Sequence, residues 1–276
     1  MRSLFCSIFI FFTIPGLFAQ SDISYIDDML EVISNIKTIE YELHAKEIIG
    51  DDFVYTNSIV KLQTQPFSFY NYIIEPDLGV EVLFTSKDKY ALINPNGFPF
   101  VNLKLDPYSR LMRKNQHHTL FDSGFDGLKN IVLSFLNRLR EFPTKYISNL
   151  GVRIFNNKEC QVLEVYNPEF SFIEYVVQKG DNIESIANKF HLSSYLILLE
   201  NNFSFYTDIE DGDTIFIPSS YAEKFEVWID LESKLPVVQK IFVKNRLFEH
   251  YEFCNIIINP EFRADEFDKD YIDYGF

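Results

Sequence analysis

Positive charge is scarce in this sequence. Its 276 residues carry 25 Lys and Arg against 40 Asp and Glu, which gives a formal net charge of −15 at pH 7. Nucleic acid and acidic lipid surfaces repel a chain of this charge, and we find no basic cluster that would overcome the repulsion. We therefore predict no nucleic-acid partner and interpret the acidic balance as a contribution to solubility.

Cysteine is also scarce, with three residues in the chain. Cys6 lies at the start of an N-terminal apolar run and not at a cleavage point, so it does not mark a lipoprotein. Cys160 and Cys254 lie in the strand-like runs CQVLEV and YEFCNIII. An exported protein can oxidise such a pair to a disulfide. Two buried thiols that behave as small apolar side chains are the interpretation we favour.

Catalytic motifs are missing. The sequence has neither HExxH nor GxSxG, and Cys160 does not lie at a helix N-terminus, where its thiolate would be favoured. His117 and His118 form an adjacent pair that could ligate a metal, but we interpret them as exposed side chains of a polar loop. No spacing of carboxylates marks an acid pair. We predict no catalysis, no metal site and no cofactor.

Long apolar runs are absent beyond the N-terminus. Residues 4–18 are apolar, Arg2 precedes them, and Ala19 offers a small residue for cleavage. This pattern predicts a signal peptide over residues 1–19, and the run is too short for a comfortable transmembrane helix. A retained membrane anchor is the alternative. We expect an exported, periplasmic protein without a transmembrane segment after cleavage, and extracellular release stays open.

Apolar and aromatic residues are abundant, at 47% and 17% of the chain, so a substantial core can form. Apolar residues recur every three or four positions in residues 21–37 and 127–139, which predicts two helices. Alternation from Thr38 to Asn94, broken by turns at hairpin spacing, predicts a sequentially wound antiparallel sheet. The segment 105–125 is less regular and holds several basic residues.

The stretch Tyr175–Pro218 has the pattern of a small domain. A short strand leads to the turn Lys179-Gly180-Asp181, two helices follow at 183–190 and 194–200, and a strand closes the unit at 214–218. In this βααβ order it resembles the LysM module, a peptidoglycan- and chitin-binding domain. The resemblance rests on Tyr175, Val177, Gly180, Asp181, Ile183, Ile186, Ala187, Phe190, Leu196, Leu199, Asn201, Ile209, Gly212, Ile215, Ile217 and Pro218.

The resemblance implies that a glycan containing N-acetylglucosamine lies in a shallow groove between two loops. The implied site residues are Gly180, Asp181, Asn182 and Ile183 in one loop, and Asn202, Phe203, Asp208 and Ile209 in the other. Amides at a helix N-terminus suit the acetamido carbonyl, and Ile183 or Ile209 suits its methyl group. Asp181 either contacts the ligand or caps the first helix. One shallow site should bind weakly, with about −4 to −8 kcal/mol.

This unit interrupts a larger sheet. The strand-like run Glu159–Tyr166 lacks a neighbour, and Phe225–Asp230 is the nearest candidate. Insertion into a hairpin loop is tolerated when the ends of the inserted domain lie close together. We predict a host domain in two parts, residues 20–172 and 220–276, with an insert at residues 173–219.

The host also shows a resemblance. Trp228-Ile229-Asp230, Lys234-Leu235-Pro236-Val237 and Tyr251-Glu252-Phe253 resemble an exported bacterial family that is similar to the outer-membrane lipoprotein carriers (LolA-like proteins). The implied α+β fold is a curved antiparallel half-barrel with covering helices. Its aromatic residues either line a cavity for a lipid or lipoprotein or form an ordinary core.

These observations favour a non-catalytic cell-envelope protein. Its insert is predicted to bind peptidoglycan or another glycan with N-acetylglucosamine, and its host domain to carry a lipid or lipoprotein. The first alternative is a structural protein whose insert contacts protein instead of glycan. A cell-wall hydrolase is the least favoured hypothesis.

Overall fold

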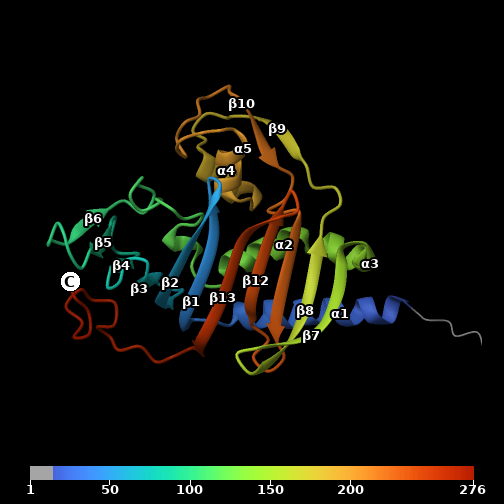
Figure 1. Cartoon of the computed structure of the whole chain (residues 1–276), viewed down its shortest axis with the longest axis horizontal. Coiled ribbons are helices and arrows are strands. Elements are labelled where there is room, and N and C mark those ends of the chain that lie inside the picture. The colour runs from blue at the N-terminus through green and yellow to red at the C-terminus, as the bar shows by residue number, and fades with distance from the viewer. Residues whose placement is uncertain (1–14) are drawn as a thin grey trace, which may run out of the picture.

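The computed structural model describes the backbone of residues 15–276 (Figure 1). Most of the predicted signal peptide, residues 1–14, lies outside these residues. Within them, eleven strands form one sheet. In chain order they are β1 (Thr38–Ile49), β2 (Asp52–Gln63), β3 (Ser68–Glu75), β4 (Glu81–Thr85), β5 (Ala91–Asn94), β6 (Leu103–Leu105), β7 (Ile147–Phe155), β8 (Lys158–Tyr166), β11 (Lys224–Asp230), β12 (Pro236–Val243) and β13 (Arg246–Ile258).

The sheet is open, with the order β6-β5-β4-β3-β2-β1-β13-β12-β11-β8-β7. Hairpins join most neighbours, and each pair runs antiparallel. Two pairings connect distant parts of the chain. The first strand lies beside the last, with Leu43 opposite Phe253, and β8 lies beside β11, with Tyr166 opposite Lys224. The pairing of β8 with β11 is the one predicted from the sequence for the strands on either side of the insert.

Helices cover one face of the sheet. The long helix α1 (Pro15–Ser34) crosses the strands, and α2 (Asp126–Glu141) lies on the same side, followed by the short α3 (Pro143–Tyr146). Ile26, Met29 and Ile33 of α1 are buried against the sheet, as their spacing predicts. The structure confirms an α+β fold built on a large antiparallel sheet that does not close into a barrel. In residues 15–276 no helix combines the length and apolar character needed to cross a membrane.

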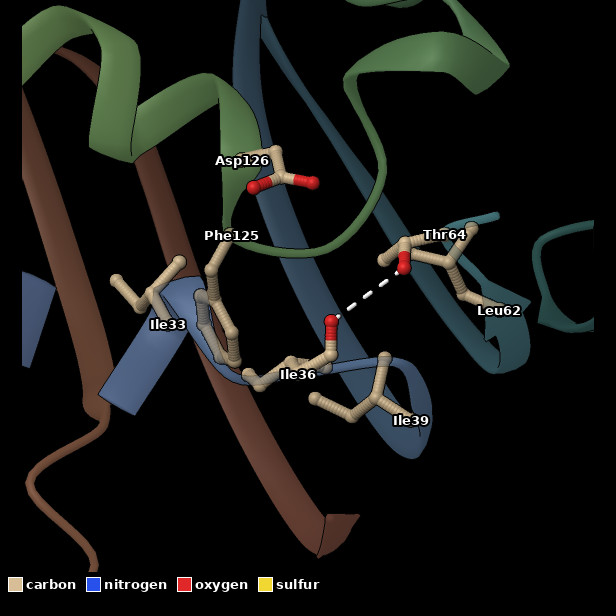
Figure 2. Close-up of a pocket in the computed structure, with 7 residues that line it drawn as sticks. All are labelled: Ile33, Ile36, Ile39, Leu62, Thr64, Phe125 and Asp126. Atoms are coloured by element: carbon tan, nitrogen blue, oxygen red, sulfur yellow. Dashed lines mark hydrogen bonds between the residues drawn. The ribbon is translucent and has the colours of Figure 1, made fainter. Parts of the chain in front are cut away.

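Side chains fill the space between helices and sheet. Tyr41, Phe125 and Phe253 pack together there, with ring centroids 4.6 to 6.4 Å apart. The cavity in Figure 2 has a volume of about 10 Å³, which is room for one water molecule at most. Its lining consists of Ile33, Ile36, Ile39, Leu62, Thr64, Phe125 and Asp126. These aromatic rings are therefore ordinary core in this structure.

The inserted segment folds around its own core between β8 and β11. It consists of β9 (Phe172–Val176), α4 (Ile183–Phe190), α5 (Ser194–Glu200) and β10 (Thr214–Pro218). The two strands pair antiparallel, with Phe172 opposite Pro218, so the ends of the segment lie together. Most of its buried apolar residues form a cluster separate from the core of the large sheet, whereas Leu196 of α5 packs with Ile48 and Phe248 of the host. Figure 1 shows the unit at one end of the sheet.

The two cysteines in the described part of the chain are free thiols. Cys160 is on β8 and Cys254 on β13, and two other strands lie between these. The disulfide alternative is therefore wrong for this structure. Burial raises the pKa of the Cys160 thiol to about 11, so the group stays protonated and acts as a small apolar side chain.

A first prediction concerns the core of the host sheet. Ile229 on β11 is fully buried, whereas Ile154 on β7 is 63% exposed. Ile229→Ala should lower the free energy of unfolding by about 2–5 kcal/mol, because it leaves a cavity. The matched change Ile154→Ala should cost less than about 1 kcal/mol. Urea denaturation of residues 20–276 measures both, and equal losses would contradict the assigned core.

Candidate functional site

The structure brings the two predicted loops side by side at the start of α4. The first loop is residues 180–183 and the second is residues 202–209. The backbone N–H of Ile183 donates to the carbonyl oxygen of Tyr206 at 3.1 Å, which ties the loops together. Gly180 has φ +89°, a conformation that glycine adopts without strain.

Asn182, and not Asp181, caps α4. The Asn182 side chain accepts the N–H of Ser185 at 2.9 Å, and the Ser185 hydroxyl accepts the N–H of Asn182 at 2.8 Å. The Asp181 carboxylate instead accepts the Tyr175 hydroxyl at 2.7 Å and the Gln178 N–H at 2.9 Å. These two hydrogen bonds lower the pKa of Asp181. The capping role proposed for Asp181 is therefore wrong.

The backbone amides and apolar side chains that were expected to hold an acetamido group already have partners within the insert. The N–H groups of Asp181, Asn182 and Ile183 donate to Gln178, Ser185 and Tyr206. The side chains of Ile183 and Ile209 belong to the buried core of the insert, at 0% and 8% exposure. A ligand at these loops would meet other edges of them, because neither these amides nor these side chains are available.

The second loop offers exposed polar groups. Asn202 and Asp208 are exposed, and Phe203 is half-buried against the core of the insert. The Asp208 carboxylate accepts the N–H groups of Ser204 and Phe205 at 2.9 and 2.8 Å. Asp208 therefore fixes the shape of this loop.

A segment of the host, which we call the docking loop (residues 106–118), lies against the insert. Arg113 makes several of these contacts: its Nη2 donates to the Ser194 hydroxyl at 3.1 Å, and its Nη1 lies 3.4 Å from the Glu184 carboxylate. Its guanidinium lies 4.1 Å from the ring centre of Tyr206. The docking loop thus contacts α4, α5 and the second loop together.

His117 makes a second contact between host and insert. Its buried ring stacks on Tyr195 of α5 at 4.1 Å and packs on Phe248 of β13 at 4.4 Å. The ring nitrogens lie 2.8 Å from the Glu249 carboxylate and 2.7 Å from the Ile48 carbonyl oxygen. The prediction of a solvent-exposed His117 is therefore wrong.

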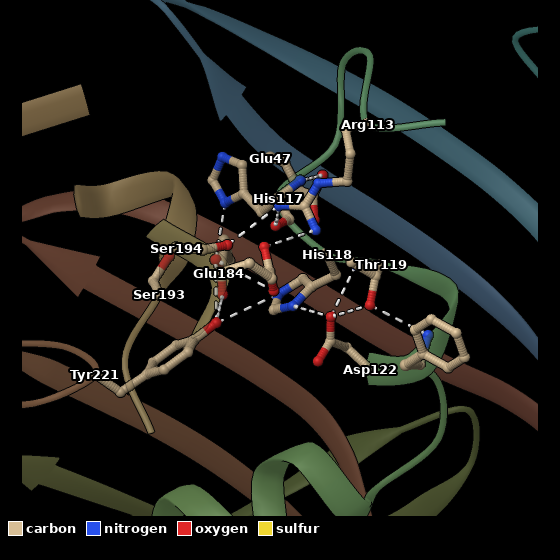
Figure 3. A network of polar contacts seen from close by, with 12 residues as sticks. Glu47, Arg113, His117, His118, Thr119, Asp122, Glu184, Ser193, Ser194 and Tyr221 are labelled. Atoms are coloured by element: carbon tan, nitrogen blue, oxygen red, sulfur yellow. Dashed lines mark hydrogen bonds and ion pairs between the residues drawn. The ribbon is translucent and has the colours of Figure 1, made fainter. Parts of the chain in front are cut away.

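His117, His118 and Tyr221 belong to a polar network (Figure 3). All three contact the buried carboxylate of Glu249. Glu249 is fully buried, lies 3.6 Å from His118, and accepts the Tyr221 hydroxyl at 3.0 Å. Burial opposes its charge, but His118 and the hydrogen bond from His117 outweigh burial and lower the pKa of Glu249 to about 2. Burial likewise opposes the charge on His118, and Glu249 reverses this effect and raises the pKa of His118 to about 9. The pair is therefore ionised at neutral pH.

These contacts mark residues that the sequence analysis assigned no role, notably Arg113, Glu184 and Tyr195. The signal that could have found Arg113 is the run RLMRKNQHH at residues 110–118, which concentrates positive charge in an acidic chain. No such local signal marks Glu184 or Tyr195. Within residues 15–276, no group of three or more His, Cys, Asp or Glu side chains is arranged to hold a metal ion.

Comparison with protein families identifies one domain: residues 175–218 match the model of the LysM domain. The resemblance inferred from the sequence is therefore confirmed for this segment. A search of curated proteins gave no match.

Solved structures with a similar chain path include a lipoprotein and a LolA superfamily protein. The Mycobacterium tuberculosis lipoprotein LppX is 8% identical, with 88% of this chain and 98% of that chain covered and a TM-score of 0.44. LprF from Mycobacterium bovis is 9% identical, with 91% and 98% covered and a TM-score of 0.44. A LolA superfamily protein from Nitrosomonas europaea is 11% identical, with 91% and 98% covered and a TM-score of 0.35.

A second prediction concerns the pH dependence of stability. Glu249 has a folded pKa below its ordinary 4.5, so its stabilising effect is present above pH 4.5 and is lost as pH falls towards 2. His118 has a folded pKa above its ordinary 6.5, so its effect is present below pH 6.5 and is lost as pH rises through 9. The advantage of the wild type over Glu249→Gln should therefore be largest between pH 4.5 and 6.5, at roughly 3–5 kcal/mol.

Urea denaturation between pH 3 and pH 10 measures this difference. Glu232→Gln serves as the control, because Glu232 is exposed and its loss should matter by less than about 0.5 kcal/mol. A difference between wild type and Glu249→Gln that stays constant over the whole range would show that the pair is not charged in the folded protein.

Proposed function

We propose that this protein is a non-catalytic component of the cell envelope whose insert, residues 173–219, binds a glycan containing N-acetylglucosamine, with peptidoglycan as the main candidate. The observation that carries the proposal is the LysM match over residues 175–218. The insert folds around its own core and holds the two loops together through the Ile183–Tyr206 hydrogen bond, which supports the same proposal. An N-terminal signal peptide, residues 1–19, would export the chain to the periplasm.

The proposed contacts come from the edges of the two loops. Residues 180–183 would present carbonyl oxygens and the side-chain amide of Asn182. The second loop would present Asn202, Phe203 and Asp208 next to the backbone of Ile209. The amides of Asp181 to Ile183 are engaged within the insert, so they would contribute through the shape of the loop. One such shallow site supplies about −4 to −8 kcal/mol, which corresponds to weak binding.

A lipid or lipoprotein ligand held between the helices and the sheet beside Ile33 and Phe125 would need a change of structure. The helices α1 and α2 occupy the covered face of the sheet, and the cavity of about 10 Å³ beside Ile33 and Phe125 has no room for an acyl chain. Carriage of such a ligand would therefore begin with movement of a helix away from the sheet.

The third prediction tests the glycan role by retention on purified peptidoglycan. Asp208→Ala should lower retention severalfold, because the second loop loses the two hydrogen bonds that shape it. Asp211→Ala removes the same charge from an exposed neighbouring residue and should leave retention unchanged. Circular dichroism confirms that both variants are folded.

Equal retention of Asp208→Ala and the wild type would count against the proposed loops. Titration with chitin oligomers, followed by NMR at the amides of Gly180 to Ile183, separates the alternatives. Absence of shifts there would favour an insert that contacts protein. Release of peptidoglycan fragments by the purified protein at any pH would instead show a wall hydrolase.

A further inference from the structure

A groove lies where the docking loop meets the insert. Its volume is about 300 Å³, at the lower end of the range for small-molecule sites. One wall is the docking loop, and the other is formed by α5 and the second loop. Its lining consists of Arg110, Arg113, Lys114, Tyr195, Leu198, Ser204, Phe205 and Tyr206.

The groove gathers positive charge in a chain whose net charge is −15. Arg110 and Lys114 are exposed, and neither forms an ion pair with any described residue. Arg113 has one carboxylate partner, Glu184, at 3.4 Å. Three cations therefore face one anion. They lie within residues 110–114, so the expectation that the sequence holds no basic cluster is wrong for this segment.

The Arg113 guanidinium is incompletely satisfied. Its side chain is 2% exposed, and its Nε and Nη1 atoms have no hydrogen-bond partner among the described residues. Buried N–H groups without an acceptor are costly, and most buried polar groups are paired. An oxygen-bearing anion in the groove would supply the missing acceptors, since guanidinium groups bind carboxylate and phosphate through paired hydrogen bonds.

Aromatic rings hold the guanidinium groups in place. Arg110 lies 4.3 Å from the ring centre of Phe205, and Arg113 lies 4.1 Å from that of Tyr206. A cation held over an aromatic ring in this way keeps a defined position at the groove wall. It also occupies one face of each ring, so the groove suits a ring with hydroxyl groups better than a flat aromatic base. Ser204 adds a hydroxyl at the same wall.

We propose that this junction groove binds an anionic sugar, a single ring that bears a carboxylate or a phosphate. Arg110, Arg113 and Lys114 hold the anionic group, and the ring lies against Leu198 and the second loop. The site differs from the proposed glycan site, because all its cations belong to the host domain. It does not depend on glycan binding by the insert.

NMR titration of residues 20–276 with three probes tests the proposal. The probes are N-acetylmuramic acid, which carries a carboxylate, N-acetylglucosamine 6-phosphate, and neutral N-acetylglucosamine. At least one acidic sugar should bind about tenfold more tightly than the neutral one, with shifts at the amides of Ser204 to Tyr206 and at the Arg113 Nε–H. The acid that binds identifies the anionic group.

Two double variants, each of which removes two positive charges, complete the test. Arg110→Ala with Lys114→Ala should weaken binding of the acidic sugar about tenfold or more. Lys87→Ala with Lys89→Ala removes two exposed cations elsewhere and should leave binding unchanged. All four positions are exposed, so these variants should fold.

Three results would overturn the proposal: equal affinity for acidic and neutral sugars, no shifts in the groove at millimolar probe, or wild-type affinity in the Arg110 and Lys114 variant. The glycan proposal has a separate readout. Chitin oligomers that leave the amides of residues 180–183 unshifted, while an acidic sugar still binds the groove, would remove the glycan role alone. The reverse pattern would remove the groove alone.

Discussion

The pairing of β8 with β11 is the constraint on which the rest of the structure depends. Tyr166 and Lys224 are directly opposite each other, so the chain between them must leave and return at one end of the sheet. A domain whose own first and last strands pair, as Phe172 and Pro218 do, meets this requirement with short connections. The insert therefore lies close to the end of the sheet, within reach of the docking loop and of Phe248 on β13.

Much of this arrangement could be predicted because local patterns report local environments. The spacing of Ile26, Met29 and Ile33 marks the buried face of α1, and the alternation that begins at Thr38 marks the sheet. The insertion was predicted because the strand-like run Glu159–Tyr166 lacked a neighbouring strand. The loops of the insert were located by residues such as Ile183, whose side chain is buried in the core of the insert.

The remaining features depend on contacts between distant segments. Nothing near His117 in the sequence indicates that Tyr195 and Phe248 enclose its ring. The helix cap is the exception, because Asn182 pairs with Ser185 three residues on and the Asp181 carboxylate accepts the nearby Tyr175 hydroxyl. The role of Arg113 exists only once Glu184 and Tyr206 are placed against it. Local periodicity carries no information about such partners.

The packing of His117 between Tyr195 and Phe248 has a mechanical consequence. A domain joined to its host by two strands alone could swing, but this ring and the Arg113 contacts fix the insert at one angle to the sheet. A polymer held by the insert would therefore set the direction in which the host faces, and not merely its location. The insert would then be joined to the host sheet through side-chain contacts with Phe248 on β13 as well as through the two connecting segments.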